Sequence, residues 1–482
     1  MAATAPPNVA GHPVTLAPPP VRAFARTGHL AVGALLVLAY VTGGGSYDRG
    51  PGDIATQLLA LPLIVWSALV LAQTPGDALR RAAIAVAGLI ALVLVLQQVP
   101  LPEGLWQSID ARAPLAADLH AAGVDTFRTT WSLSPLASEA GAWSILPALA
   151  VFLGVLALPP ARHRALSLTL VALAAASLVL GYLQLGAPQD SLLNPFPEWK
   201  PALGGIFANQ NHQATSLAIA LAAILAILLY DRNRVDEAGL SRWKRVALGI
   251  VGVLMLASLP LTNSRAALLI AVLVLVGVAL ALRHGARSQA RSTGRQRVGQ
   301  VALALLAAGA IASAFAWMQV DIAEEVRWDA AAATAALARE HAPIGAGLGS
   351  FIPWFDQAAP EALIGGAYFN HAHNEYAQWW FESGVGGLLA VLATLVLLAW
   401  VVPRRSWGAT GTGSDRGAAV AAWAGCAVLL LHSIVDYPLR TPALMTAGAL
   451  LFAMAISQRA GMASRGAREP QESRRGAAPP QA

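Results

Sequence analysis

The sequence contains little charge and almost no cysteine. Only 12% of its 482 residues are charged and 56% are hydrophobic, whereas a soluble protein carries roughly twice that charged fraction. The one cysteine, Cys426, lies within an apolar stretch, which excludes an intramolecular disulfide and a cysteine-based metal site. This composition, with a mean hydropathy of +0.57, indicates a protein whose solvent is the lipid bilayer.

Long apolar runs fill the sequence where a soluble protein would alternate polar and apolar residues. About 20 consecutive apolar residues are enough to cross the hydrocarbon core as a helix. We therefore predict an all-α polytopic membrane protein with about 12 transmembrane helices and a large periplasmic loop, 320–382, between spans 9 and 10. The expected spans are 29–46, 54–73, 82–101, 140–158, 166–186, 211–230, 246–262, 266–282, 301–319, 383–402, 418–435 and 441–457.

Basic residues lie mostly on one side of this arrangement. With the N-terminus inside, 24 of the 32 Lys and Arg residues face the cytoplasm, five of them in each of the short loops 231–245 and 283–300. The eight on the outer side are Arg49, Arg112, Arg128, Lys200, Arg265, Arg327, Arg339 and Arg440. The positive-inside rule then predicts that both termini are cytoplasmic and that the long loops are periplasmic, in a bacterial inner membrane. The net charge of +6 reflects this topology, and we expect no nucleic-acid partner.

Two arginines of the outer side are candidate anion ligands. Arg265 follows Ser264 in a tight hairpin between two spans, and Arg327 precedes the Ala-rich helical stretch 329–340 of the large loop. A cation at membrane depth is costly, so Arg265 either reaches the lipid headgroups or holds an anion. A guanidinium binds phosphate oxygens in pairs, and two such groups would suit a pyrophosphate.

His373 is the outer residue best suited to proton transfer, because imidazole titrates near neutral pH. His371, two residues earlier, is its competitor, and a structural histidine at the start of a helix is the alternative. A histidine pair is common in metal sites, but no carboxylate lies at a metalloenzyme spacing beside this one, and we expect neither a metal nor a cofactor.

Further polar groups fall on the same side. Asn209, Asn211 and His212 enter the sixth span, and Asp436 follows His432 at the end of the eleventh. The glycines of 345–349 follow no strand and open no βαβ unit, so they predict a close backbone approach and no dinucleotide loop.

Together these motifs resemble the O-antigen ligase and polymerase family with its Wzy-C domain. The most specific part is His373-Asn374 followed after nine residues by Gly384-x-x-Gly387. Arg265 in Asn-Ser-Arg, and Arg327 before Pro-Ile-Gly-x-Gly-x-Gly-x-Phe, look like the two functional arginines of the ligases. The resemblance covers about 204–442, including the Asn-x-Asn-His and His-Ser-x-x-Asp-Tyr-Pro stretches.

The resemblance implies a metal-independent, inverting glycosyltransferase of the GT-C type. Its donor would be an oligosaccharide or polysaccharide on undecaprenyl pyrophosphate, and its acceptor lipid A–core, a growing glycan or protein Ser/Thr. His373 would be the catalytic base and Arg265 and Arg327 the pyrophosphate ligands. The supporting residues would be Asn209, Asn211, His212, Ser264, His371, Asn374, Gly384, Gly387 and Asp436.

The same reading divides the chain into four parts. These are a Pro-rich cytoplasmic tail at 1–28, an N-terminal transmembrane bundle at 29–203, a catalytic transmembrane region at 204–457 and a disordered cytoplasmic tail at 458–482. We expect the first apolar run to be a retained anchor. The rival hypothesis is a transporter or flippase of lipid-linked glycans or small anions. A transporter should place charge near the middle of its spans, where this sequence has almost none.

Overall fold

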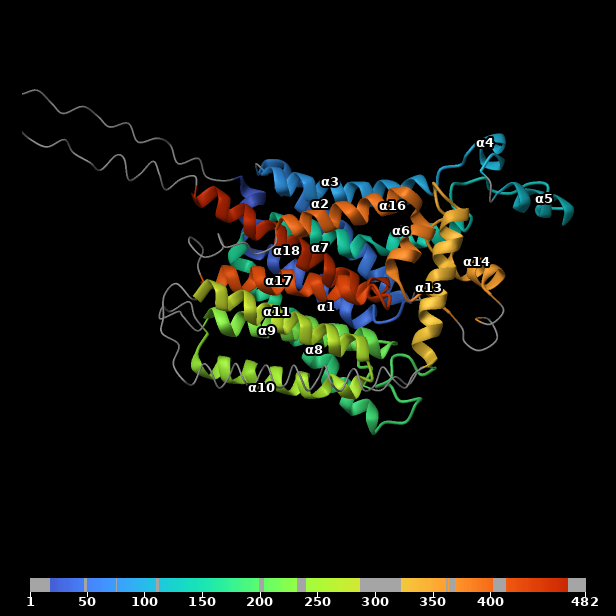
Figure 1. Cartoon of the computed structure of the whole chain (residues 1–482). Coiled ribbons are helices and arrows are strands. Elements are labelled where there is room, and N and C mark those ends of the chain that lie inside the picture. Colours follow the sequence, from blue (N-terminus) through green and yellow to red (C-terminus); the bar gives the residue numbers. More distant parts are fainter. Residues whose placement is uncertain are drawn as a thin grey trace, which may run out of the picture.

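A computed structural model shows a bundle of helices (Figure 1). It describes residues 18–46, 50–74, 76–109, 112–198, 203–231, 240–286, 322–360, 363, 369–401 and 413–466. The expected ninth span, 301–319, lies outside these residues. The described part consists of helices, turns and one isolated β-bridge between Pro100 and Thr130.

Most of the expected spans correspond to helices. The principal helices are α1 (Pro19–Thr42), α2 (Pro51–Gln73), α3 (Ala78–Leu96), α6 (Pro135–Ser144), α7 (Leu146–Ala157), α8 (His163–Leu185), α9 (Gln210–Asp231), α10 (Arg242–Ser258), α11 (Arg265–Ala286), α16 (Glu375–Trp400), α17 (Gly413–His432) and α18 (Pro442–Gly466). Within the described ranges, seven segments are long and apolar enough to cross a membrane, and stretches of α11, α17 and α18 are shorter apolar helices. The chain is therefore a polytopic helical membrane protein. The number twelve stays a prediction.

α9 is the central helix of the bundle. In its apolar stretch 83% of the residues are buried, against 17% in α3, which lies at the edge of the bundle. Three polar side chains of α9 are nonetheless buried, namely Gln213, Thr215 and Ser216. They pair with Ser177 of α8, His432 of α17 and Tyr40 of α1 respectively. Hydrogen bonds between helices therefore fix α9 against three neighbours, as is common where the surroundings are apolar.

The first and last parts of the chain share one hydrophobic core. It extends from Phe24 of α1 to Ile456 of α18. α7 packs against α2 and α18, while α17 packs against α9 and α11. The start of α1 and the end of α18 lie together at one end of the bundle (Figure 1).

The opposite end, which we call the site end, carries the short helices. α13 (Ile322–Glu340) runs across this end, and α14 (Phe351–Ala358), α4 (Glu103–Gln107) and α5 (Ala113–Ala121) lie beyond the spans (Figure 1). The expected helix at 329–340 is thus confirmed as the second part of α13. A second, smaller core around Phe351, Phe355 and Phe381 joins α14 to α16.

Two helices begin at least eight residues earlier than expected. α1 begins at Pro19, although its first apolar run starts at 29, because a proline is accommodated at the first position of a helix. α16 begins at Glu375 although the apolar run starts at 383. The first two turns of α16 carry Glu375, Gln378 and Glu382, which are all buried. Hydropathy cannot reveal a helical turn whose buried groups are polar.

Candidate functional site

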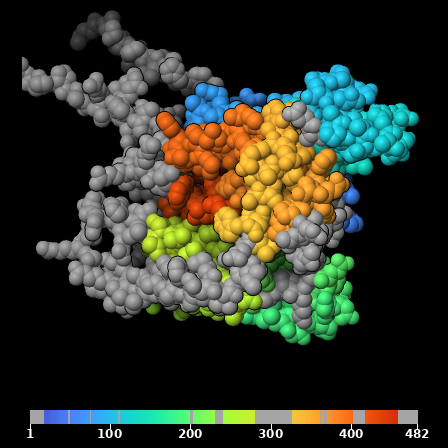
Figure 2. All heavy atoms as spheres, turned by 45° about the vertical axis from the view of Figure 1, so that its right-hand side comes forward, coloured from blue at the N-terminus to red at the C-terminus, as the bar shows by residue number. Residues whose placement is uncertain are grey.

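Four polar segments from distant parts of the sequence meet at the site end. They are the start of α9, the loop 369–374 before α16, the turn 433–441 between α17 and α18, and α13. In Figure 2 the molecule is turned so that the site end comes forward. The red C-terminal segment reaches the surface there, between the orange segment that includes α16 and the yellow-green segment. The histidines and Asp436 singled out from the sequence belong to these segments.

Tyr437 lies at the centre of the histidines. Its ring centroid is 4.4 Å from that of His371, 4.9 Å from His373 and 5.0 Å from His212. Asn209 donates a hydrogen bond to its hydroxyl, with 3.3 Å between Nδ2 and Oη. Asn209 also accepts from the backbone N–H of Asn211, which fixes the first turn of α9. One aromatic ring therefore fixes the spacing of three imidazoles.

Asp436 supplies the negative charge of this group and is fully buried. Its Oδ1 lies 3.6 Å from Nδ1 of His373 and 3.9 Å from Nε2 of His212. The backbone N–H of Tyr437 also donates to Oδ1. Burial opposes the ionisation of Asp436, but its interactions with His373, His212 and His432 favour it more strongly. The pKa of Asp436 is therefore held well below its ordinary value. Asp436 is therefore a carboxylate at neutral pH. We call His212, His371, His373, His432, Asp436 and Tyr437 the histidine cluster.

Arg327 acts on the cluster through its charge. It lies half-buried in α13, which crosses the site end. Burial raises the pKa of Tyr437 to about 12, Asp436 adds to this rise, and the positive charge of Arg327 opposes it. The tyrosine hydroxyl is therefore neutral, and the guanidinium is near enough to act on the cluster.

Arg265 begins α11 at the same end of the bundle. It follows the short 3-10 helix η2 (Pro260–Thr262), which ends at Asn263 in the left-handed conformation, with φ of 55°. Asn is one of the few residues that adopt this conformation readily. The turn η2 packs against α9, and Ser264 is buried beside it. The structure thus places Arg265 at the start of a helix that packs against α9, which begins at Gln210.

Asn374 caps α16 and joins two segments of the site. Its Oδ1 accepts from the N–H of Ala377, and its Nδ2 donates to the carbonyl of Ile434, each at 2.9 Å. His373 directly before it has a positive φ of 51°. The loop with His373 is therefore held to the turn with Asp436 by one amide side chain.

α16 is interrupted at Gly384, whose φ of 56° and ψ of −150° belong to a region that only glycine populates readily. The break frees the carbonyls of Phe381 and Glu382, which accept from the N–H groups of Ala346 and Gly347 at 2.8 and 2.9 Å. Val385 in turn donates to the carbonyl of Pro343. The glycine-rich loop 343–350, which we call the glycine loop, thus pairs with the opened helix.

Glycine is required on both sides of this contact. A Cβ on Gly384 would lie 2.2 Å from the carbonyl oxygen of Pro343, and one on Gly345 would lie 2.6 Å from the nitrogen of Gly384. Gly387 stays helical, and its missing side chain makes room for Trp379, whose indole donates to its carbonyl. The expected close backbone approach at 345–349 is confirmed, and only Gly384 of the Gly384-x-x-Gly387 pair forms a break.

Residues 250–392 match the family model for O-antigen ligase. This stretch of the chain is similar to an O-antigen ligase domain. The match includes Arg265, Arg327, His373 and both glycines of the signature, so the resemblance seen in the sequence is confirmed. It is narrower than the stretch 204–442 over which the resemblance was drawn. No curated protein matches the chain.

Residues beyond the matched boundaries lie with the matched ones at the site end. Asn209 and His212 precede the match and Asp436 and Tyr437 follow it, yet all four contact one another or His373. Among the described residues, no three His, Cys, Asp or Glu side chains are arranged to share a metal ion. Independence from metal stays a prediction.

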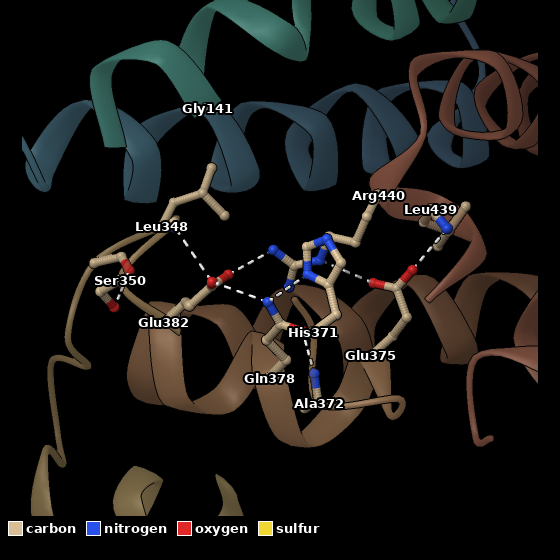
Figure 3. Close-up of polar contacts among 12 residues, drawn as sticks. Gly141, Leu348, Ser350, His371, Ala372, Glu375, Gln378, Glu382, Leu439 and Arg440 are labelled. Atoms are coloured by element: carbon tan, nitrogen blue, oxygen red, sulfur yellow. Dashed lines mark hydrogen bonds and ion pairs between the residues drawn. The ribbon is translucent and has the colours of Figure 1, made fainter. Parts of the chain in front are cut away.

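Sequence reasoning missed a second set of polar residues within the matched stretch and beside it. Gln378, Glu382, Arg440 and Glu375 form a network that adjoins the histidine cluster (Figure 3). The available signal was weak, namely two carboxylates and an amide just before the apolar run of α16. Their arginine partner is 58 residues away from Glu382 in sequence.

Proposed function

We propose that this protein transfers an oligosaccharide or polysaccharide from undecaprenyl pyrophosphate to an acceptor hydroxyl at the periplasmic face of the bacterial inner membrane. The observation that carries the proposal is the approach of His373 to the buried carboxylate of Asp436, 3.6 Å apart. It occurs at the end of a membrane bundle, and its histidine lies within the stretch that matches the O-antigen ligase family model.

His373 would act as the general base of the reaction. Its Nδ1 faces Asp436, which leaves Nε2 for the acceptor hydroxyl. The hydroxyl oxygen forms a bond to the anomeric carbon while the bond from that carbon to the pyrophosphate oxygen breaks. The proton passes to His373, and the carboxylate stabilises the imidazolium that results, as in other imidazole–carboxylate pairs. Attack from the face opposite the leaving group would invert the anomeric centre, and no metal or cofactor takes part.

Arg265 and Arg327 would bind the pyrophosphate. Negative charge develops on the leaving group as the bond breaks, and fixed cations stabilise it most where water is scarce. Arg327 belongs to α13, and its charge opposes the rise in the pKa of Tyr437, while Arg265 begins α11, which packs against α9. Together they would flank the histidine cluster from two sides.

The sidedness of the site supports an enzyme over a transporter. The candidate residues gather at one end of the bundle, whereas a transporter needs polar groups near the middle of its spans. The site end carries the segments assigned to the periplasm from the distribution of basic residues, and a lipid-bound donor would reach it laterally. We propose region 204–457 as the catalytic region and lipid A–core or a growing glycan as the acceptor.

Reconstituted transfer tests the proposal. The purified protein in liposomes is given a lipid-linked glycan together with lipid A–core, or with a second lipid-linked glycan as the only acceptor. We expect a longer or newly attached glycan in one arm, which separates ligase from polymerase. If the glycan lipid crossed the bilayer and no glycosidic bond formed in either arm, transport would replace the proposal.

A further inference from the structure

Glu382 contacts three separate parts of the site end. Its side chain is fully buried, and its Oε2 accepts from Nη1 of Arg440 at 2.6 Å. Its Oε1 accepts from Nε2 of Gln378 at 3.1 Å and from the N–H of Gly349 at 3.2 Å. Its backbone carbonyl accepts from Gln97 and Gly347. Figure 3 shows Glu382 between Arg440, Gln378 and the loop segment at Leu348.

Gln378 connects Glu382 to the loop that holds His373. Its Oε1 accepts from the backbone N–H of Ala372 at 3.0 Å, and its Nε2 lies 3.1 Å from Nδ1 of His371. The two residues before His373 are therefore fixed by one amide, which Glu382 orients. This anchoring matters because His373 itself has a positive φ, a conformation that is costly for a residue with a side chain.

Arg440 carries the contact to the turn that holds Asp436. Its Nε lies 3.4 Å from Oε2 of Glu375, whose other oxygen accepts from the N–H of Leu439. The two carboxylates raise the pKa of Arg440 against the effect of burial, so the guanidinium stays charged. A buried carboxylate needs such a cation and further donors to be tolerated.

We propose that Glu382 is a positioning residue, which sets the distance between His373 and Asp436 by holding the histidine loop, the 433–441 turn and the glycine loop in one arrangement. The inference rests on the proposed function for its catalytic consequence. Glu382 would act only through Gln378 and Arg440, and it would not touch the donor or the acceptor.

Three variants separate this role from simple stabilisation. Glu382→Gln keeps the shape of the side chain but removes its charge. It also replaces one accepting oxygen with an amide NH2 group, which would face another donor. Gln378→Met breaks the link to the histidine loop and leaves the Glu382–Arg440 ion pair intact. Glu375→Gln is the matched comparison, because it weakens a carboxylate contact to the same arginine and to Leu439 of the turn without touching Gln378 or the glycine loop.

Two readouts are measured on each purified full-length variant. The first is the steady-state kcat and KM of transfer. The second is the rate at which diethyl pyrocarbonate modifies His373, followed by mass spectrometry with exposed His120 as the internal reference. We expect Glu382→Gln and Gln378→Met to lower kcat at least about tenfold with unchanged KM for the donor. Both should also speed the modification of His373 severalfold, while Glu375→Gln changes either readout less.

The outcomes distinguish the two levels of the argument. An unchanged modification rate of His373 in both variants would overturn the positioning role, and so would an equal loss of kcat in Glu375→Gln. If Glu382→Gln did not accumulate in the membrane, Gln378→Met would decide. If the wild-type protein transferred no glycan, the proposed function would fail, and the modification rates would still test the positioning role.

Discussion

The histidine cluster and the Glu382 network lie side by side but differ in how their polar atoms are paired. Both carboxylate oxygens of Glu382 and both side-chain polar atoms of Gln378 have hydrogen-bond partners, although Nη2 of Arg440 is buried without one among the described residues. In the cluster, both ring nitrogens of His212, Nε2 of His432 and Oδ2 of Asp436 are buried without a hydrogen-bond partner among the described residues.

The difference indicates what each region is for. Leaving a buried polar group without a hydrogen bond typically costs about 1–3 kcal/mol of stability. Such groups are therefore expected where they serve function, for example by binding a substrate. A network whose hydrogen-bond acceptors are all paired with protein donors holds the backbone segments around it in place. A cluster with unfilled polar atoms can receive the hydroxyl and oxygen atoms of a substrate. The predictions below test this division, from the largest expected effect to the smallest.

Replacing Asp436 should have the largest effect of these three. Asp436→Asn keeps the size of the side chain but removes the charge that would stabilise the imidazolium, so we expect transfer to fall about a thousandfold or more. Donor binding should change little. Asp356→Asn, on exposed α14 at the same end, is the control. Near-normal transfer by Asp436→Asn would show that the carboxylate is not part of the base.

The arginines should come next. Arg265→Lys and Arg327→Lys keep a positive charge but lose the paired N–H groups, and each should lower transfer about a hundredfold through weaker pyrophosphate contact. Arg339→Lys changes an exposed residue of the same helix as Arg327 and should transfer normally. Wild-type rates in both site variants would remove the arginines from the donor site.

A change at Gly384 should act on the folded structure more than on the chemistry. Gly384→Ala places a Cβ against the carbonyl of Pro343 in a conformation that disfavours any side chain, so we expect a clear loss of thermal stability in detergent. In Gly386→Ala the new Cβ meets only a side-chain methyl of Val93, at 3.0 Å. Equal melting temperatures for the two variants would contradict the backbone contact at the break.

Much of the fold was predictable because the sequences of lipid-facing helices are long apolar runs. α2 and α8 begin and end within a few residues of the expected spans. The first turns of α16 were not predictable, since their buried residues are charged or amides whose partners come from elsewhere. Pairing between Glu382 and Arg440 leaves no local pattern in the sequence.

For the candidate site, local motifs identified the residues but not their arrangement. The His373-Asn374 signature and the positions of Arg265 and Arg327 were visible because they stand out against apolar surroundings. The role of Tyr437 as the ring on which His212, His371 and His373 pack was not, because an aromatic residue at the end of a span has many other uses. Distances between segments arise only from the packing of helices.

The dependence of transfer on pH sharpens the comparison between the two histidines of the loop. The pKa of Asp436 lies well below its ordinary value, so this carboxylate stays ionised as the pH falls from neutral. Burial, together with the charge of Arg440, lowers the pKa of His371 well below the usual value, so His371 stays neutral over the same range. A loss of activity on mild acidification would therefore come from neither Asp436 nor His371, and a pH profile of transfer by His371→Ala that keeps the shape of the wild-type profile would check this.

The most direct test is transfer by His373→Ala beside His371→Ala, with donor binding and a chelator arm measured in parallel. The account predicts that His373→Ala loses transfer about a hundredfold to ten-thousandfold, the usual range for a general base, and still binds the donor. It also predicts a smaller loss for His371→Ala and no effect of chelation. Full activity of His373→Ala, or activity lost on chelation and restored by a divalent ion, would contradict it.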